Sequence, residues 1–413
     1  MNKEILKDLP TRNPLEEDIQ EAIASLDAEE EPTEDGEQQT TIVNEIKHID
    51  SGMDDNEGTT KAFDLLRQQK PLMPEEDKFS FYDERGQKLY NQFACINNLI
   101  VRLHDEVRNN VFTDIDYYQV VGVLPVWIRD AGHSQESAMT REFFEKLVGA
   151  NNNYFVNKFL YYHDCEMLVN ALQNRFCTVE TLLNQVFTLL DPVLKYNYQE
   201  YDNVIFTIDD TSERVNAYIN TIIITLASIC DIMTKIAIEL EGMSTLDFTK
   251  YPKMLSANST YGDSRRLPHA LKQKGTYFAA DRSAAIVKVE TLRNEIVHNG
   301  SLDFNARMYY GIKGDEIENW ILVPSFKEDG NFSTYNGRKK FYDDPKRIWN
   351  TELPAMTMDF LVESEDTLQL LLKKYSKDYY ENDGDLKKYH NEILSLTSSF
   401  MAIVEKEAKK QES

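Results

Sequence analysis

The sequence predicts a mainly α-helical protein, a helical bundle with a small β-hairpin or sheet inserted before its C-terminal helices. Between positions 85 and 410, several stretches repeat apolar residues at three- and four-residue steps. Residues 302–352 instead mix aromatic and β-branched runs with the turn pairs Asp329-Gly330 and Asn336-Gly337, which are typical of antiparallel strands. Hydrophobic residues make up 41% of the 413, enough to bury a core.

The helical stretches follow one another along most of the chain. They are residues 85–110, 138–173, 178–196, 209–243, 279–300, 356–380 and 385–410. Thr178 is predicted to begin the third helix, and Pro192 to bend or end it. We divide the chain into five parts: a largely disordered acidic region (residues 1–75), a helical segment (76–140), a helical domain that carries the motif described below (141–301), a β-rich insertion (302–352), and C-terminal helices that complete the bundle (353–413).

The stretch at residues 209–243 is the most apolar helix of the chain. Asp210 and Thr211 are candidates for its N-cap, and Gly242 is predicted to stop it. Asp231 and Lys235 interrupt its apolar run, which favours a buried core helix over a membrane span. With no secretory segment visible at the N-terminus, we expect a soluble, cytoplasmic protein.

The negative charge is concentrated at the N-terminus. Residues 1–60 hold 18 Asp and Glu against 4 Lys and Arg, a net of −14 out of −25 for the whole chain. The overall charge excludes a general nucleic-acid coat, but it leaves room for a local RNA site. The four cysteines are widely spaced and no pair of histidines lies near them, so we expect reduced, mostly buried thiols and no zinc site.

One short stretch, "RNEIVHNG" at residues 293–300, could carry chemistry. The sequence has no glycine-rich phosphate loop, no G-x-S-x-G and no H-E-x-x-H. An arginine and a histidine at this spacing occur about once by chance in such a chain. The context is more specific, because Asn294 follows Arg293, and Ile296 and Val297 are predicted to continue the apolar face of the helix. A purely structural reading is that both cations complement the dipole of a helix that ends at Gly300.

The stretch from Arg293 to His298 resembles the R-x4–6-H motif of the HEPN superfamily, many of whose members are metal-independent endoribonucleases of bacterial defence and toxin–antitoxin systems. The resemblance is specific only over residues 293–298. It implies a HEPN-type bundle in which two copies of the motif meet across a dimer axis and share one RNA-binding cleft. No cofactor and no metal are implied.

The same resemblance assigns roles to three residues. His298 would act as general base or acid on the ribose 2′-hydroxyl or the leaving 5′-oxygen, a role that suits the ordinary pKa of an imidazole. Arg293 would hold the scissile phosphate, and Asn294 would orient either side chain. Attack by the 2′-hydroxyl restricts the substrate to RNA.

Two basic clusters on either side of the motif are candidate RNA-binding surfaces. The RNA-binding residues that we predict are Arg265, Arg266, Lys272, Lys274, Arg338, Lys339 and Lys340. Solvated loops are the alternative for each cluster. The stretch His163-Asp164-Cys165 is interpreted as packing rather than a site, since adjacent helix positions point in different directions.

Two classes of function remain open from the sequence. The first is a dimeric HEPN-type ribonuclease whose substrate is RNA. An inhibitory or sensor protein would keep this enzyme inactive. The acidic N-terminal region could serve the same purpose by competing for the basic clusters. The second is a non-catalytic helical module that binds a nucleotide or protein partner, with Arg293 and His298 as structural residues.

Overall fold

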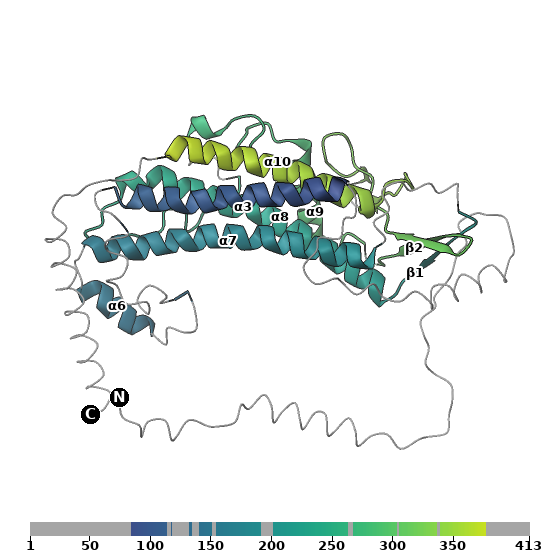
Figure 1. The fold of residues 1–413 in the computed structure, drawn as a ribbon, viewed down its shortest axis with the longest axis horizontal. Coiled ribbons are helices and arrows are strands. Elements are labelled where there is room, and N and C mark those ends of the chain that lie inside the picture. Colours follow the sequence, from purple (N-terminus) through teal and green to yellow (C-terminus); the bar gives the residue numbers. More distant parts are fainter. Residues whose placement is uncertain are drawn as a thin grey trace, which may run out of the picture. The chain divides into compact units, whose positions relative to one another are not determined.

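The computed structural model describes a helical bundle joined to a small antiparallel sheet (Figure 1). The chain divides into two units, residues 1–45 and 46–413, and everything described here belongs to the second. The structure describes residues 84–113, 117, 132–133, 140–150, 154–190, 201–262, 267–303, 305–336 and 339–376. The predicted acidic region 1–75 and the predicted helix at 385–410 lie outside these ranges.

Four long helices and one shorter one enclose the main core. They are α3 (Glu84–Val111), α7 (Tyr154–Leu189), α8 (Asp210–Gly242), α9 (Ala284–Asn299) and α10 (Trp349–Tyr375). α8 packs against α7, α9 and α10, while α3 packs against α7 and α10. Described helices from the predicted segments 76–140, 141–301 and 353–413 thus contribute to one core, in which α10 completes the bundle as predicted for the C-terminal helices. A further helix, α6, spans Arg141–Ala150.

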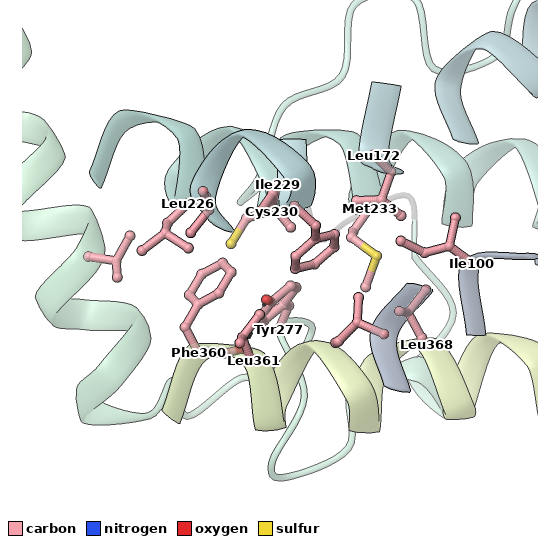
Figure 2. Packing of buried hydrophobic residues seen from close by; sticks show 14 of the residues in the cluster. Ile100, Leu172, Leu226, Ile229, Cys230, Met233, Tyr277, Phe360, Leu361 and Leu368 are labelled. Atoms are coloured by element: carbon pink, nitrogen blue, oxygen red, sulfur yellow. Dashed lines mark hydrogen bonds between the residues drawn. The ribbon is translucent and has the colours of Figure 1, made fainter. Parts of the chain in front are cut away.

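α8 is the central helix of this core. Its buried side chains lie on all sides of the helix only at residues 236–240, and Figure 2 shows Leu226, Ile229, Cys230 and Met233 meeting side chains of α3, α7 and α10. Among the described residues, one apolar stretch is long enough to cross a membrane; it lies in this helix, and 61% of it is buried inside the protein. The expected buried core helix is therefore what the structure contains.

The start of α8 differs from the prediction by one residue, while its end is the predicted one. Asp209, not Asp210 or Thr211, is the N-cap, and its carboxylate accepts from the backbone N–H of Ser212 in a reciprocal capping box. α8 ends at Gly242, as predicted, and a short 3-10 turn at Met243–Thr245 follows it. A Cβ at Gly242 would lie 2.2 Å from Leu255 Cδ1, so the glycine also permits close packing at this end of the helix.

α7 is one continuous helix of 36 residues, so the predicted helix start at Thr178 is wrong. The Thr178 hydroxyl donates to the Asn174 carbonyl one turn back, a bond that satisfies a threonine inside a helix. Val179 and Leu183 on the same stretch are fully buried, and this packing overrides the local start signal. Pro192 lies outside the described residues.

The three-stranded sheet has the order β1-β2-β3 and is antiparallel throughout. β2 (Met308–Lys313) and β3 (Glu316–Trp320) form the hairpin expected within residues 302–352. β1 (Asn203–Thr207) comes from the segment before α8 and was not predicted. The insertion is therefore not self-contained, because its sheet is completed by the strand that leads into the central helix.

The rest of the insertion lies against α9. A two-stranded hairpin, β4 (Thr334–Tyr335) and β5 (Lys339–Lys340), follows a turn in which Phe326 stacks on Phe332. The predicted turns fit this region, since Gly330 has φ 84° and Asn336 has φ 53°. Gly337 lies outside the described residues. α10 begins at Trp349, a few residues before the predicted boundary at 353.

All four cysteines are free thiols. Cys165 and Cys230 are buried, Cys95 is half-buried and Cys177 is exposed. Burial raises the pKa of Cys165 and Cys230 well above the ordinary thiol value, so both stay protonated. The expectation of mostly buried thiols thus holds for these two and fails for Cys177.

Candidate functional site

The candidate site lies at the C-terminal end of α9. Ser283 caps the start of this helix by accepting from the backbone N–H of Ile286 at 3.2 Å. At the other end Gly300, with φ 93°, donates its N–H to the Ile296 carbonyl at 3.1 Å. The motif therefore occupies the last two turns of a well-capped helix, as the position of Gly300 predicts.

The buried face of α9 is the predicted one with a single exception. Ile286, Val289, Leu292 and Ile296 are all buried in the bundle core. Val297, expected to continue this face, has 49% of its surface exposed. It lies 100° around the helix from Ile296, which turns it away from the core and toward the exposed side of the motif.

The three motif residues come together on that exposed side. Asn294 and His298 are exposed and lie one turn apart, so they are neighbours on the helix surface. Arg293 is half-buried and about 140° away from His298 on an ideal helix. Its Nη1 donates to Asn294 Oδ1 at 3.0 Å, so the guanidinium is joined to the exposed Asn294 side chain.

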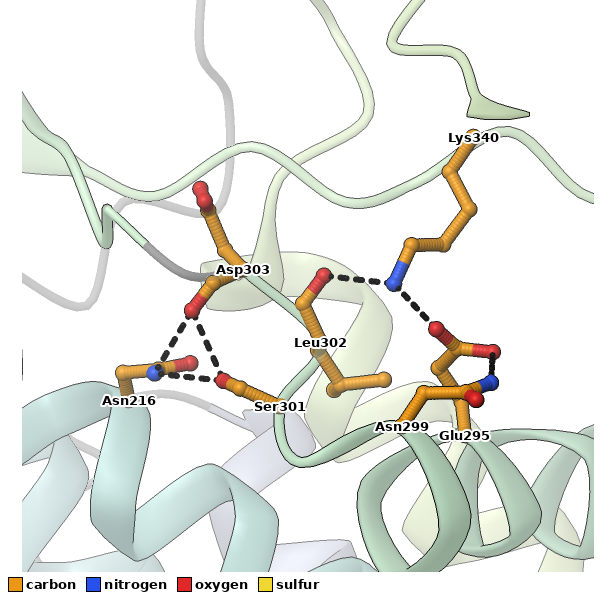
Figure 3. Close-up of polar contacts among 7 residues, drawn as sticks. All are labelled: Asn216, Glu295, Asn299, Ser301, Leu302, Asp303 and Lys340. Atoms are coloured by element: carbon orange, nitrogen blue, oxygen red, sulfur yellow. Dashed lines mark hydrogen bonds and ion pairs between the residues drawn. The ribbon is translucent and has the colours of Figure 1, made fainter. Parts of the chain in front are cut away.

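Glu295 lies between the arginine and the histidine, and its charge is balanced locally. Lys340 Nζ donates to Glu295 Oε1 at 2.7 Å and to the Leu302 carbonyl at 2.9 Å, as Figure 3 shows. Asn299 donates to the other carboxylate oxygen at 2.8 Å. Burial raises the pKa of Glu295, but these bonds outweigh it and hold that pKa below its usual value. The carboxylate is thus ionised and paired.

The chain that leaves α9 is fixed to α8 by hydrogen bonds. Asn216 of α8 donates to Ser301 Oγ at 3.3 Å and to the Asp303 carbonyl at 3.4 Å (Figure 3). Ser301 in turn donates to the same carbonyl at 2.7 Å. These contacts set the direction in which the chain leaves the helix and hold the end of the motif in place.

The predicted RNA-binding residues are not all close to the motif. Lys340 is joined to it through Glu295 and would have to leave that pair to bind a phosphate, and the exposed Lys339 is its neighbour in β5. Arg265, Arg266 and Arg338 lie outside the described residues.

Lys272 and Lys274 lie at a distant place on the bundle. Close contacts join Ser283 to Glu363 and Lys288 to Glu352, so α9 and α10 run antiparallel. The loop with both lysines is anchored to Thr367 of α10 by the Tyr277 N–H. From the helical rise, the loop and His298 are separated by roughly 30 Å along the bundle.

A second group of titratable side chains involves residues 163–166 of α7. His163 Nδ1 lies 3.0 Å from Glu166 Oε2, and His133 Nε2 lies 3.0 Å from Asp164 Oδ1, while Tyr251 donates to the other oxygen of Asp164. The sequence could not reveal the role of His133, because it lies 31 residues from Asp164. In the described ranges no group of three or more His, Cys, Asp or Glu could hold a metal ion.

The arrangement on α9 has a definite chemical capacity. A guanidinium can hold a phosphate through two parallel hydrogen bonds, and an exposed imidazole can donate or accept a proton near neutral pH. Asn294 contacts the first and neighbours the second. No family model, curated protein or solved structure matches this chain.

Proposed function

We propose that this protein is a HEPN-type endoribonuclease that cleaves RNA without a metal ion, through attack of the ribose 2′-hydroxyl. The observation that carries the proposal is the grouping of Arg293, Asn294 and His298 on the exposed end of α9. We place the enzyme in the cytoplasm, in antiphage defence or a toxin–antitoxin system. An inhibitory or sensor protein would then hold it inactive.

The proposed reaction needs a phosphate anchor and proton transfer. The 2′-oxygen attacks phosphorus as its proton passes to a base, and the bond to the 5′-oxygen breaks as that oxygen takes up a proton. The products are a 2′,3′-cyclic phosphate and a 5′-hydroxyl. Arg293 would bind the non-bridging oxygens, where negative charge develops in the transition state. His298 would carry out one of the two proton transfers.

A second copy of the chain would supply the other proton transfer. One chain offers one exposed imidazole in this motif, whereas the reaction needs both a base and an acid. Val297, with 49% of its surface exposed, lies beside the motif and would be covered in such a contact. A two-fold axis here would bring each motif close to its own copy.

Substitution of the motif residues tests the proposal. His298→Ala and Arg293→Ala are each expected to lower the rate of RNA cleavage in EDTA by about a hundredfold or more. His269→Ala and Arg175→Ala are matched controls, since both side chains are exposed and lie on other elements. If wild-type protein cleaves no RNA, or if the motif variants cleave as fast as the controls, the chain is instead a non-catalytic binding module.

A further inference from the structure

The β4–β5 hairpin carries exposed aromatic side chains beside lysines. Tyr335 has 60% of its surface exposed and Phe341, directly after β5, has 40%. Residues 325–347 contain six Lys and Arg against four Asp and Glu, a net of +2 in a chain of −25. Exposed aromatic rings and a local excess of positive charge therefore occur together in this segment.

The register of the hairpin places these groups on one face. Tyr335 pairs directly with Lys339, so their side chains lie on the same side of the hairpin. Phe341 follows Lys339 by two residues, directly after the end of β5, and its carbonyl accepts from Ser325 N at 2.7 Å. Alternation along the strand returns its ring to that same face. We call Tyr335, Lys339 and Phe341 the outer face.

The opposite face of the hairpin is attached to the motif helix. Lys340 reaches Glu295 and the Leu302 carbonyl, as described above, and its ammonium lies 5.8 Å from the Phe332 ring centre. Tyr342, the residue after Phe341, has 36% of its surface exposed. The hairpin that carries the outer face is thus fixed to α9 through the bond from Lys340 to Glu295, which lies between Arg293 and His298 in the sequence.

We infer that the outer face of the β4–β5 hairpin binds single-stranded RNA. Bases stack on Tyr335 and Phe341, and Lys339 pairs with the phosphate between them. A duplex hides its bases within its own stack, so the face selects unpaired strands. This inference rests on the proposed function for its substrate, but stacking on aromatic rings does not depend on the 2′-hydroxyl.

Binding of oligothymidylate to the full-length protein tests the outer face without cleavage, because that strand has no 2′-hydroxyl. By fluorescence anisotropy, Tyr335→Ala and Phe341→Ala are each expected to weaken binding about tenfold. Lys339→Ala is expected to weaken binding. It should also reduce the slope of log binding constant against log salt concentration by about one, the value for one phosphate contact. The matched control is Tyr90→Ala, a tyrosine of α3 that is 49% exposed; it should bind as wild type does.

Each result separates the inference from the proposed function. Three results would overturn the inference whether or not the protein cleaves RNA. They are no binding of oligothymidylate by wild type, hairpin variants that bind as tightly as Tyr90→Ala, or a blunt duplex that binds as well as the single strand. If the hairpin variants lose binding as expected while wild type cleaves no RNA, the platform stands and the ribonuclease proposal fails.

Discussion

At the scale of single residues, Gly330 is the point where the insertion packs most closely against the backbone of α9. Its φ of 84° is strained for any residue with a side chain. A Cβ there would lie 2.5 Å from the Ala284 carbonyl oxygen and 2.9 Å from Lys288 N, both backbone atoms of α9. The glycine therefore lets the turn at residues 327–331 lie directly on the helix.

Gly330→Ala is expected to destabilise the protein by more than the strain of its backbone conformation. Gly314→Ala is the matched control, because Gly314 also has a positive φ, of 60°, but nothing lies within 4 Å of a Cβ built there. The control should cost about 1–2 kcal/mol of unfolding free energy, and Gly330→Ala clearly more. Urea unfolding of both variants measures the difference; equal losses would mean that the turn does not press on α9.

Among the elements, α3 and α7 are joined at a site that depends on pH. His104 of α3 is half-buried, and burial lowers the pKa of its imidazole, while Glu166 and Asp105 offset part of this effect. The folded state therefore binds a proton at His104 less readily than the unfolded chain does. The stability contributed by neutral His104 is present above the unfolded pKa near 6.5 and is lost as pH falls toward the lower folded pKa.

We expect the unfolding free energy of wild type to fall more steeply between pH 7 and 5 than that of His104→Gln. Glutamine keeps a polar side chain of similar size and cannot take up the proton. His269→Gln, at an exposed position on another element, controls for the exchange of histidine for glutamine itself. Identical slopes for wild type and His104→Gln would contradict the argument.

Elements could be predicted from sequence where their signals are local. The buried stripe of α9 and its end at Gly300 follow from apolar spacing and one glycine. β1 could not be predicted in this way. Its five residues are too few to show an alternation of apolar and polar side chains, and they form a strand only because they pair with β2. Thr178 gave a misleading start signal because the burial of Val179 and Leu183 depends on tertiary packing.

The sequence indicates which residues form the candidate site, but not which distant residues contact them. The order of Arg293, Asn294 and His298 is visible in the sequence, whereas the Glu295–Lys340 pair joins residues that are 45 positions apart. The separation of Lys272 and Lys274 from the motif likewise depends on how the loop at residues 267–283 crosses α10. Long-range placement of this kind leaves no pattern in a single sequence.

At the scale of the whole molecule, we expect two chains to assemble through the surface that carries the motif. Val297→Glu would place a charge in the proposed interface and is expected to leave a monomer of about 48 kDa with little cleavage activity. Val362→Glu is the control, because Val362 of α10 is similarly exposed, at 45%. Sedimentation of wild type and both variants measures the assembly. A wild-type monomer that cleaves RNA would contradict a shared site.

The chemistry of the cleaved ends tests the central claim most directly. Wild-type protein in EDTA is given an oligoribonucleotide, and mass spectrometry identifies the new termini. We predict a 2′,3′-cyclic phosphate and a 5′-hydroxyl, no cleavage where the scissile nucleotide carries a 2′-deoxyribose, and loss of both products in His298→Ala. Cleavage at the 2′-deoxy position at an unchanged rate, or no cleavage of the all-ribose strand, would contradict the account.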